Sequence, residues 1–457
     1  MTLRLIRALD NKTHRANALS SDIDGFGIEK EFLVLDNGAP VRKDGKGVIE
    51  KALHGLMAGF EAPKSQPAKI GEQDAAQFDI ETLEQGIAAG YLITPEYIGP
   101  SEDDCFIGLE IRSLPCTQIP DASRQLTQLE KLLYEAFDKT GLTVAPLAVH
   151  TQHNGRPAFV SPSLQLHISH PKEVWEAAVA SAKFEYSDGR PFEPKTEHQR
   201  KLLGIYSFGM LMENIYPIIA ALAANSTDRL QRPRFYDYKV KTYTDLADLS
   251  DTTSQLSFVQ ATRTRPEFGT LELRNLDSMV SVRDTLVPTA LAVAYSGMLA
   301  EQLINGAPDV PDGGTGVCLG RGTVTLLLAL ENSKRVARDG ANAKLLFATN
   351  PKEIMYFENY AFGHLVALHN SGLLGSVGVE RGWFWEGSVK EHLCSIRPQL
   401  APHLKQIGAP DEALDLIFAG DKCQSFKHER IGDEHELAFR AADDSAGNNS
   451  WYATKTI

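Results

Sequence analysis

Four short segments share one pattern, and it restricts the fold more than any other feature of the chain. Aliphatic residues alternate with charged or polar residues in segments 27–35, 106–114, 164–169 and 269–275. Such alternation is typical of β-strands, in which successive side chains point to opposite faces. Asp36-Asn-Gly38 and Pro115 end the first two segments. The pattern predicts an antiparallel sheet with one aliphatic face and one polar face.

The predicted polar face carries an unusual set of side chains. Its members are Glu29, Glu31, Glu110, Arg112, Gln165, His167, Thr270, Glu272 and Arg274. Carboxylates a few Å apart raise one another's pKa unless a cation neutralises them. A divalent metal meets this need; oxygen ligands favour Mg²⁺ or Mn²⁺, and a histidine favours Mn²⁺ slightly. The alternative interpretation is that these residues form the solvated outer face of an ordinary antiparallel sheet.

Segments with helical periodicity lie between the predicted strands. The expected fold class is therefore α+β. Leu126, Leu129, Leu133 and Phe137 recur at helical spacing, with Asp121 or Ser123 as N-cap and Gly141 as the end. Further helices are expected after Pro171, over residues 201–224, near Leu286, and through most of the chain after residue 305. Segment 82–104 is expected to be an elaborated loop that forms a lid, and the glycine-rich segment 312–322 a flexible connection.

Charge and composition exclude several classes of protein. The 457 residues carry a net charge of −13, which disfavours a nucleic-acid partner. The apolar stretches 215–224 and 286–303 contain Pro217 and Pro288 and are interpreted as buried helices, so no membrane partner is expected. The five cysteines form no CxxC pair, and the first residues do not form a signal peptide, so we expect a cytoplasmic protein.

Five motifs in order resemble the second glutamate–cysteine ligase family, the bacterial carboxylate–amine ligases. The motifs are Gly-Ile-Glu-Lys-Glu-Phe, Leu-Glu-Ile-Arg-Ser-Leu-Pro-Cys, Leu-His-Ile, Leu-Ala-Ala-Asn-Ser and Phe-Gly-Thr-Leu-Glu-Leu-Arg-Asn. The resemblance spans about residues 25–305. It implies the glutamine synthetase/guanido kinase-like catalytic fold, a curved antiparallel sheet flanked by helices. We therefore expect a catalytic core over 1–305 and a mainly helical part over 306–457 packed on the same unit.

The resemblance also implies roles for individual residues. Glu29, Glu31, Glu110, His167 and Glu272 resemble metal ligands for Mg²⁺ or Mn²⁺. Arg274 and Arg232 resemble arginines that reach the transferred phosphoryl group, and Asn225 and Arg112 are expected to contact substrate. Two positions depart from the family pattern: Gln165 replaces a first histidine, and Thr227 replaces a proline after Asn225-Ser.

The implied activity is ATP-dependent joining of a small acid to an amine through an acyl phosphate, with γ-glutamyl transfer to an amino acid as the family default. Two alternatives stay open: a guanidino phosphotransferase, and a non-catalytic binding protein that retains the fold. The expected partners are the acid and amine substrates, and a homodimer is the commonest symmetric assembly.

Overall fold

The structure is a computed structural model that describes residues 3–6, 24–42, 45–60, 87, 92–98, 106–146, 162–180, 183–186, 191–212, 215–223, 262–265, 269–305, 322–349, 367–368 and 371–410. Its strands are β1 (Leu3–Ile6), β2 (Gly25–Asp36), β3 (Ala39–Pro40), β4 (Ile93–Ile98), β5 (Phe106–Arg112), β6 (Thr143–Ala145), β7 (Ser163–Ser169), β8 (Lys183–Tyr186), β9 (Pro191–Phe192), β10 (Thr262–Arg265), β11 (Thr270–Asp277), β12 (Lys344–Ala348) and β13 (Phe384–Ser388). Its helices are α1 (Lys46–Met57), α3 (Ile119–Asp138), α4 (Lys172–Ala180), α5 (Glu197–Met212), α6 (Tyr216–Leu222), α8 (Val282–Asn305), α9 (Gly322–Asp339), the 3₁₀ helix η4 (Gly340–Asn342), α11 (Leu374–Glu380) and α12 (Val389–Gln406).

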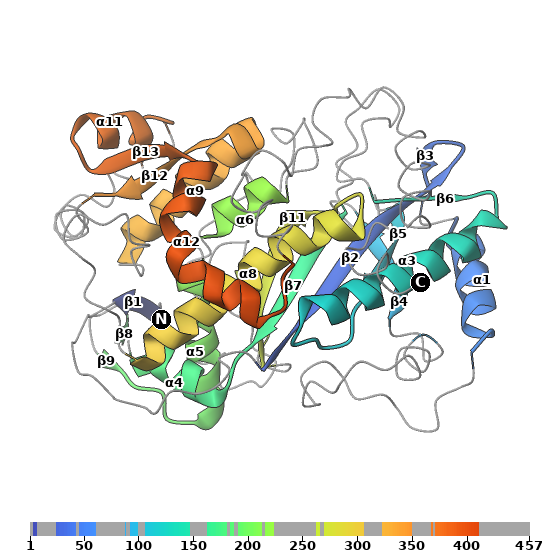
Figure 1. Ribbon diagram of the computed structural model, residues 1–457, viewed down its shortest axis with the longest axis horizontal. Helices are drawn as coiled ribbons and strands as arrows, with labels where there is room; N and C mark the ends of the chain where they lie inside the picture. The colour runs from blue at the N-terminus through green and yellow to red at the C-terminus, as the bar shows by residue number, and fades with distance from the viewer. Residues whose placement is uncertain are drawn as a thin grey trace.

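An eight-stranded antiparallel sheet organises the molecule (Figure 1). Its main path runs β10-β11-β7-β2-β5-β4, and β3 and β6 also pair with β2. The four segments predicted as strands are β2, β5, β7 and β11, and they lie side by side. The prediction of an α+β fold with an antiparallel sheet flanked by helices is confirmed.

The turn after β2 follows from its sequence. Asn37 and Gly38 have φ of 48° and 83°, which suits a two-residue hairpin because asparagine and glycine tolerate positive φ. Leu35 then pairs with Pro40 in β3. The predicted strand and turn are both confirmed.

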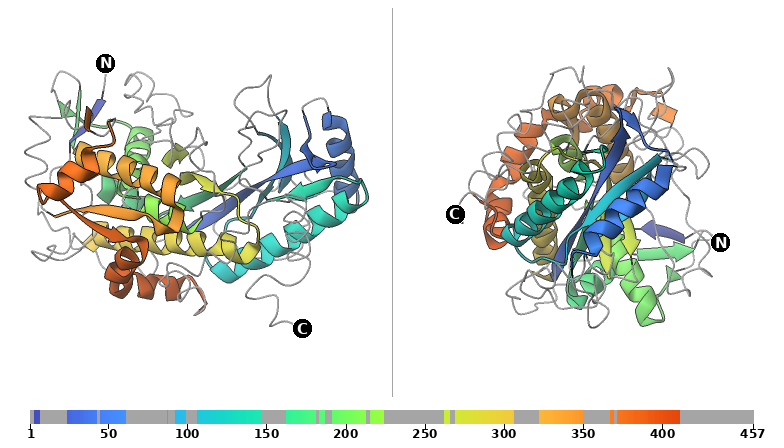
Figure 2. Two further views of the ribbon diagram at one scale, coloured as in Figure 1. Left: turned by 90° about the horizontal axis from the view of Figure 1, so that it is seen from above. Right: turned by 90° about the vertical axis from the view of Figure 1, so that its right-hand side faces the viewer.

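Helices α3 and α8 cover the aliphatic face of the sheet, and Figure 2 shows them along the same side. Ile28 and Phe32 of β2 are completely buried on this face, as are Leu126 and Leu133 of α3. Burial of such side chains stabilises the fold by roughly 1.5 to 3 kcal/mol each. This packing leaves the polar side chains on the other face of the sheet.

A buried ion pair joins β2 to α3 inside this core. Lys30 points to the aliphatic face, and its Nζ lies 2.6 Å from Glu130 Oε1. Both side chains have no exposed surface. The pair ties the central strand to the helix that covers it.

The start of α3 differs from the prediction. The N-cap is Gln118, which makes no side-chain capping bond, and Pro120 lies in the first turn. The backbone N–H of Ile119 instead donates to the carbonyl oxygen of Ile407, at 2.9 Å. Asp121 and Ser123 were therefore wrong as N-caps, because a contact with a distant segment satisfies the helix end.

The two apolar stretches form buried helices, as predicted. α8 is long and apolar enough to cross a membrane by length and composition, but 83% of its most apolar window is buried inside the protein. α6 is buried along its whole length. The single helix predicted over 201–224 was wrong, because α5 ends at Met212 and Pro217 lies in the first turn of a separate α6.

The predicted loop over 82–104 also needs correction. Residues 93–98 form β4, which pairs with β5 at the edge of the sheet. Pro95 made this segment resemble a loop in the sequence. Proline is nevertheless tolerated in an edge strand, because its missing N–H removes no hydrogen bond to a neighbouring strand on the open side. Apart from Ile87, Leu92 and β4, this segment lies outside the described residues.

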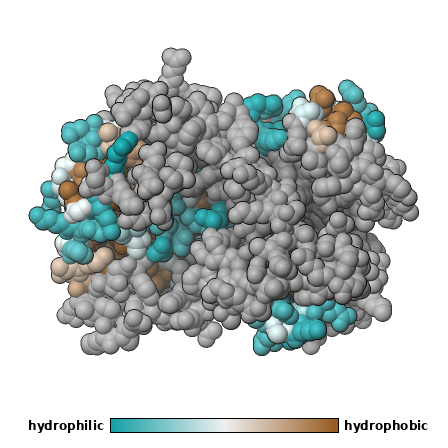
Figure 3. Space-filling view, turned by 180° about the vertical axis from the view of Figure 1, so that it is seen from behind, coloured by the Kyte–Doolittle hydropathy of each residue, from teal (hydrophilic) through white to brown (hydrophobic). Residues whose placement is uncertain are grey.

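The described residues after 305 combine helices with a small two-stranded antiparallel sheet. α12 packs on α8, α9 packs on α6, and β12 pairs with β13. The predicted connection 312–322 lies outside the described residues except for Gly322, and the domain boundary at 305 stays a prediction. Figure 3 shows a hydrophobic spot at the corner formed by α11 and β13, where Leu373, Val379 and Trp385 are exposed.

Candidate functional site

Strand register brings the predicted polar side chains onto one face. Glu31 is directly opposite Glu110, and Glu29 is opposite Arg112. Because directly opposed residues of antiparallel strands point to the same side, these four share a face.

The neighbouring strand pair adds the remaining groups to this face. On β7 and β11, His167 is opposite Glu272, and Gln165 is opposite Glu29 on β2. The sheet therefore places Glu29, Glu31, Glu110, Arg112, His167 and Glu272 together, as the alternation predicted. We call this set, with Gln165 and Arg274, the polar face.

Arg112 bridges two carboxylates of the polar face. Its Nε lies 3.3 Å from Glu29 Oε1, and its guanidinium also contacts Glu110. Its side chain keeps 31% of its surface exposed. Arg112 was predicted to contact substrate; in this arrangement it neutralises carboxylates.

Glu31 is held by two hydrogen bonds that the sequence did not reveal. The backbone N–H of Ser163 donates to Glu31 Oε2 at 2.7 Å, and the Gln165 amide donates to Oε1 at 2.9 Å. Together they fix the rotation of the carboxylate while leaving lone pairs available. The alternation had placed Gln165 on the polar face, and the family pattern has a histidine at this position, but neither signal predicted a bond to Glu31.

His167 lies between two partners. Its Nδ1 is 3.3 Å from Thr270 Oγ1, and its Nε2 is 3.4 Å from Glu29 Oε2. The imidazole thus connects β11 to β2 across the face, at only 2% exposure.

A bulge in β11 sets the position of Arg274. The register with β7 shifts between Leu273 and Leu276, which frees the Arg274 carbonyl from the ladder. Tyr216 Oη donates to that carbonyl at 2.6 Å. The Arg274 side chain is 37% exposed, and its Nε lies 2.8 Å from Glu272 Oε1. Arg274 can therefore reach a ligand while it balances the buried Glu272.

The face carries more negative charge than its arginines balance. The pKa of Glu110 is raised from 4.5 to about 9, first by burial and next by the charge of Glu29, while Arg112 opposes the shift. Glu31 raises this pKa further. A group in this state binds either a proton or a cation.

The carboxylate oxygens and the imidazole of the polar face are suitable ligands for a divalent cation. Their arrangement is not that of an assembled metal site. Among the described residues, no three His, Cys, Asp or Glu side chains gather closely enough to hold a metal ion. In this arrangement Arg112 contacts Glu29 and Glu110, and Arg274 contacts Glu272. The metal ligand assignment of Glu29, Glu31, Glu110, His167 and Glu272 stays a prediction. Asn225 and Arg232 lie outside the described residues.

Comparison with known proteins gives little. No protein-family model and no curated protein matches the chain. Among solved structures, it is similar to the 2.0 Å crystal structure of a glutamate–cysteine ligase from Francisella tularensis in complex with AMP. The likeness covers 95% of this chain and 91% of that chain, at 11% identity and a TM-score of 0.45. A likeness of this size supports no conclusion about fold family or function.

Proposed function

We propose that the protein is an ATP-dependent carboxylate–amine ligase of the glutamate–cysteine ligase type, with a glutamine-synthetase-like fold. One observation carries the proposal: carboxylates from β2, β5 and β11 converge with His167 on one buried face, and Glu110 there has its pKa raised to about 9. An ordinary solvated sheet face does not bury opposed glutamates, because each loses hydration without gaining a counter-charge. The motif resemblance described above supports the same activity.

The proposed residues divide into two groups by role. Glu29, Glu31, Glu110, His167 and Glu272 would hold Mg²⁺ or Mn²⁺, which supplies charge neutralisation for the ATP phosphates. Arg274 would contact the transferred phosphoryl group, because its planar fork suits equatorial phosphate oxygens. Arg232 and Asn225 are proposed for the phosphoryl group and the substrate from the motif resemblance alone.

The chemistry requires no nucleophilic side chain. An oxygen of the acid substrate forms a bond to the terminal phosphorus of ATP as the bond to ADP breaks, which gives an acyl phosphate. The amine then forms a bond to the acyl carbon and loses a proton, and inorganic phosphate leaves. The protein contributes position and charge, with a buried face that excludes water from the acyl phosphate.

ADP release by the purified protein tests this proposal. The assay contains ATP and Mg²⁺ and screens amino acids as acids, each with and without a panel of amines. Release that requires both an acid and an amine is the expected result. Release with a guanidino compound alone would replace the ligase with a phosphotransferase, and no release with any pair would favour a non-catalytic binding protein. Localisation in the cytoplasm and the absence of nucleic-acid and membrane partners remain part of the proposal.

A further inference from the structure

The sequence of β11 contains one residue more than strict alternation allows. Leu271 and Leu273 are buried on the aliphatic face, and the next leucine of the strand is Leu276, three positions later. Leu276 is opposite Leu164 of β7 and is also buried. Because strand side chains alternate, Leu273 and Leu276 can share a face only if one residue is added between them. The leucine spacing therefore requires a bulge that includes Arg274.

The bulge takes the backbone of Arg274 out of the strand pairing. Leu273 and Leu276 pair with β7 residues that are two positions apart, so positions 274 and 275 share one opposing residue, Gln165. On the other side, the described pairing of β11 with β10 ends at Leu273. Among the described strands, neither neighbour pairs with Arg274. Its carbonyl oxygen therefore needs a partner from elsewhere, since a buried backbone group without one is unfavourable.

Tyr216 supplies this partner from outside the sheet. Its hydroxyl donates to the Arg274 carbonyl oxygen at 2.6 Å, and the tyrosine is buried. Tyr216 is the first residue of α6, which lies beside β11 (Figure 1) and also packs against α8 and α9. The hydroxyl is thus held at one place in the core, and it holds the bulge in turn.

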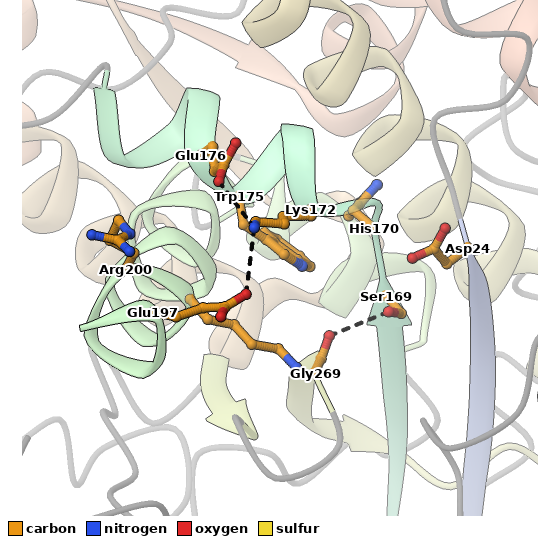
Figure 4. Close-up of a pocket in the computed structure, with 10 residues that line it drawn as sticks. Asp24, Ser169, His170, Lys172, Trp175, Glu176, Glu197, Arg200 and Gly269 are labelled. Atoms are coloured by element: carbon orange, nitrogen blue, oxygen red, sulfur yellow. Dashed lines mark hydrogen bonds and ion pairs between the residues drawn. The ribbon is translucent and has the colours of Figure 1, made fainter. Parts of the chain in front are cut away.

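The two ends of β11 are held by bonds that do not involve α6. At the start, the Ser169 hydroxyl donates to the Gly269 carbonyl oxygen at 3.2 Å (Figure 4). This contact lies at a pocket of about 270 Å³, lined by residues next to the start of β2 and from β7, α4 and α5. After the end, the Ser278 hydroxyl donates to the Glu31 carbonyl oxygen at 2.6 Å. Loss of the Tyr216 hydroxyl should therefore release the bulge and leave the rest of the strand in place.

The Arg274 side chain depends on the bulge for its position. Its Nε lies 2.8 Å from Glu272 Oε1, and 37% of the side chain is exposed. Among the described contacts, this ion pair uses only Nε, so the terminal nitrogens remain for a ligand. A shift of roughly 1 Å in a group that acts on a transition state can lower the rate about a hundredfold. The backbone of Arg274 must therefore be fixed if its guanidinium is to act on a reacting group.

We propose that Tyr216 is a positioning residue for phosphoryl transfer, because its hydroxyl holds the bulge of β11 in the shape that directs Arg274 to the terminal phosphate of ATP. Tyr216 acts through the backbone of Arg274 and not by contact with a substrate. The part of Arg274 in phosphoryl transfer rests on the ligase function proposed above. The anchoring of the bulge by Tyr216 rests on the structure alone.

A double-mutant cycle in ADP release tests this role. The variants are Tyr216→Phe, Arg274→Lys and the double variant, assayed with ATP, Mg²⁺ and the acid and amine that the screen identifies. Tyr216→Phe removes only the hydroxyl, and we expect kcat to fall roughly 10-fold to 100-fold, with KM for ATP changed by less than about twofold. In the Arg274→Lys background the same substitution should change kcat by less than about twofold, because lysine lacks the fork that the bulge directs.

Hydrogen–deuterium exchange measures the anchoring without turnover. Tyr216→Phe should exchange faster than the wild type in the peptide that covers residues 270–277, with the rest of the protein unchanged. Tyr134→Phe is the matched control, since Tyr134 lies on α3 across the sheet, edge-on to Phe32. It should alter neither kcat nor exchange at 270–277. Circular dichroism gives the folded fraction by which every rate is divided.

The possible results separate this role from the ligase itself. If the wild type releases ADP with an acid and an amine, a kcat that Tyr216→Phe leaves unchanged, or lowers equally in both backgrounds, would overturn the positioning role and leave the ligase standing. Unchanged exchange at 270–277 would overturn the anchoring of the bulge. A wild type that never releases ADP would overturn the ligase together with the part of Tyr216 in phosphoryl transfer, and faster exchange would then retain only the anchor.

Discussion

Glu31 and Glu110 lie directly opposite each other on β2 and β5, with both carboxylates on the polar face. Hydrogen bonds from Ser163 and Gln165 hold the first, and Arg112 contacts the second. Burial and the neighbouring carboxylates raise the pKa of Glu110 to about 9. The two buried carboxylates repel each other when both are ionised, and binding of a proton or a cation reduces this repulsion.

This relationship predicts a stability that depends on pH. Glu110 titrates near 4.5 in the unfolded chain and near 9 in the fold, so the folded state binds the extra proton between these values. Its contribution is fully present below pH 4.5 and is lost as pH rises toward 9, by up to about 1.4 kcal/mol per pH unit. Urea unfolding in EDTA from pH 5 to 8 measures the slope.

Glu110→Gln provides the comparison for that slope. Glutamine imitates the protonated carboxyl, so the variant should gain stability relative to the wild type as pH rises, and Glu135→Gln on the exposed side of α3 should not. Added Mg²⁺ should flatten the wild-type slope. Parallel slopes for the wild type and Glu110→Gln would contradict the raised pKa.

Glu272→Gln should abolish metal-dependent ATP turnover while leaving the fold intact. Glu272 is fully buried opposite His167 and pairs with Arg274. Its charge therefore acts on the groups of the polar face and not on solvent. We expect ADP release to fall by at least about a hundredfold, which corresponds to roughly 2.7 kcal/mol of transition-state stabilisation. Circular dichroism and thermal unfolding check the fold. Unchanged turnover would remove Glu272 from the site.

Gln165→Leu should weaken metal binding without direct loss of a ligand. The substitution removes the hydrogen bond to Glu31 Oε1 and leaves the Ser163 bond to Oε2 in place. Loss of a group that orients a ligand typically costs about 10-fold to 100-fold in metal affinity. Titration with Mn²⁺ by electron paramagnetic resonance gives the dissociation constant, with Lys131→Gln as control. An affinity equal to that of the wild type would mean that Gln165 does not position Glu31 for a cation.

Lys30→Met should destabilise the protein through the core and not through the site. The substitution leaves Glu130 buried without its 2.6 Å partner, which typically costs about 3 to 5 kcal/mol. Lys30→Met with Glu130→Met should recover most of this loss, because neither charge then remains buried. Urea unfolding of the single and double variants measures both values, and ADP release per folded molecule should stay unchanged. Equal stabilities of the single variant and the wild type would show that the pair does not form.

Local alternation in the sequence was enough to predict which side chains share a face. The side-chain period of a strand is set by the backbone, so Glu29 and Glu31, or Glu272 and Arg274, are neighbours whatever the rest of the chain does. The same reasoning predicted β2, β5, β7 and β11, and the continuous apolar stretch 286–303 predicted the buried helix α8. The alternation also predicted the excess of carboxylates, because the number of acidic positions does not depend on register.

Partners between distant segments depended on the three-dimensional arrangement. Glu31 and Gln165 are separated by 134 residues, and their contact follows from the register of β2 with β7. The same holds for the Ile119 bond to Ile407 in place of a side-chain cap. The pocket at Ser169 and Gly269 is built from segments of β2, β7, α4 and α5 that no sequence window contains. A two-residue change of register would exchange these contacts and leave every side chain on its own face. The alternation therefore predicted the face and not the contacts within it.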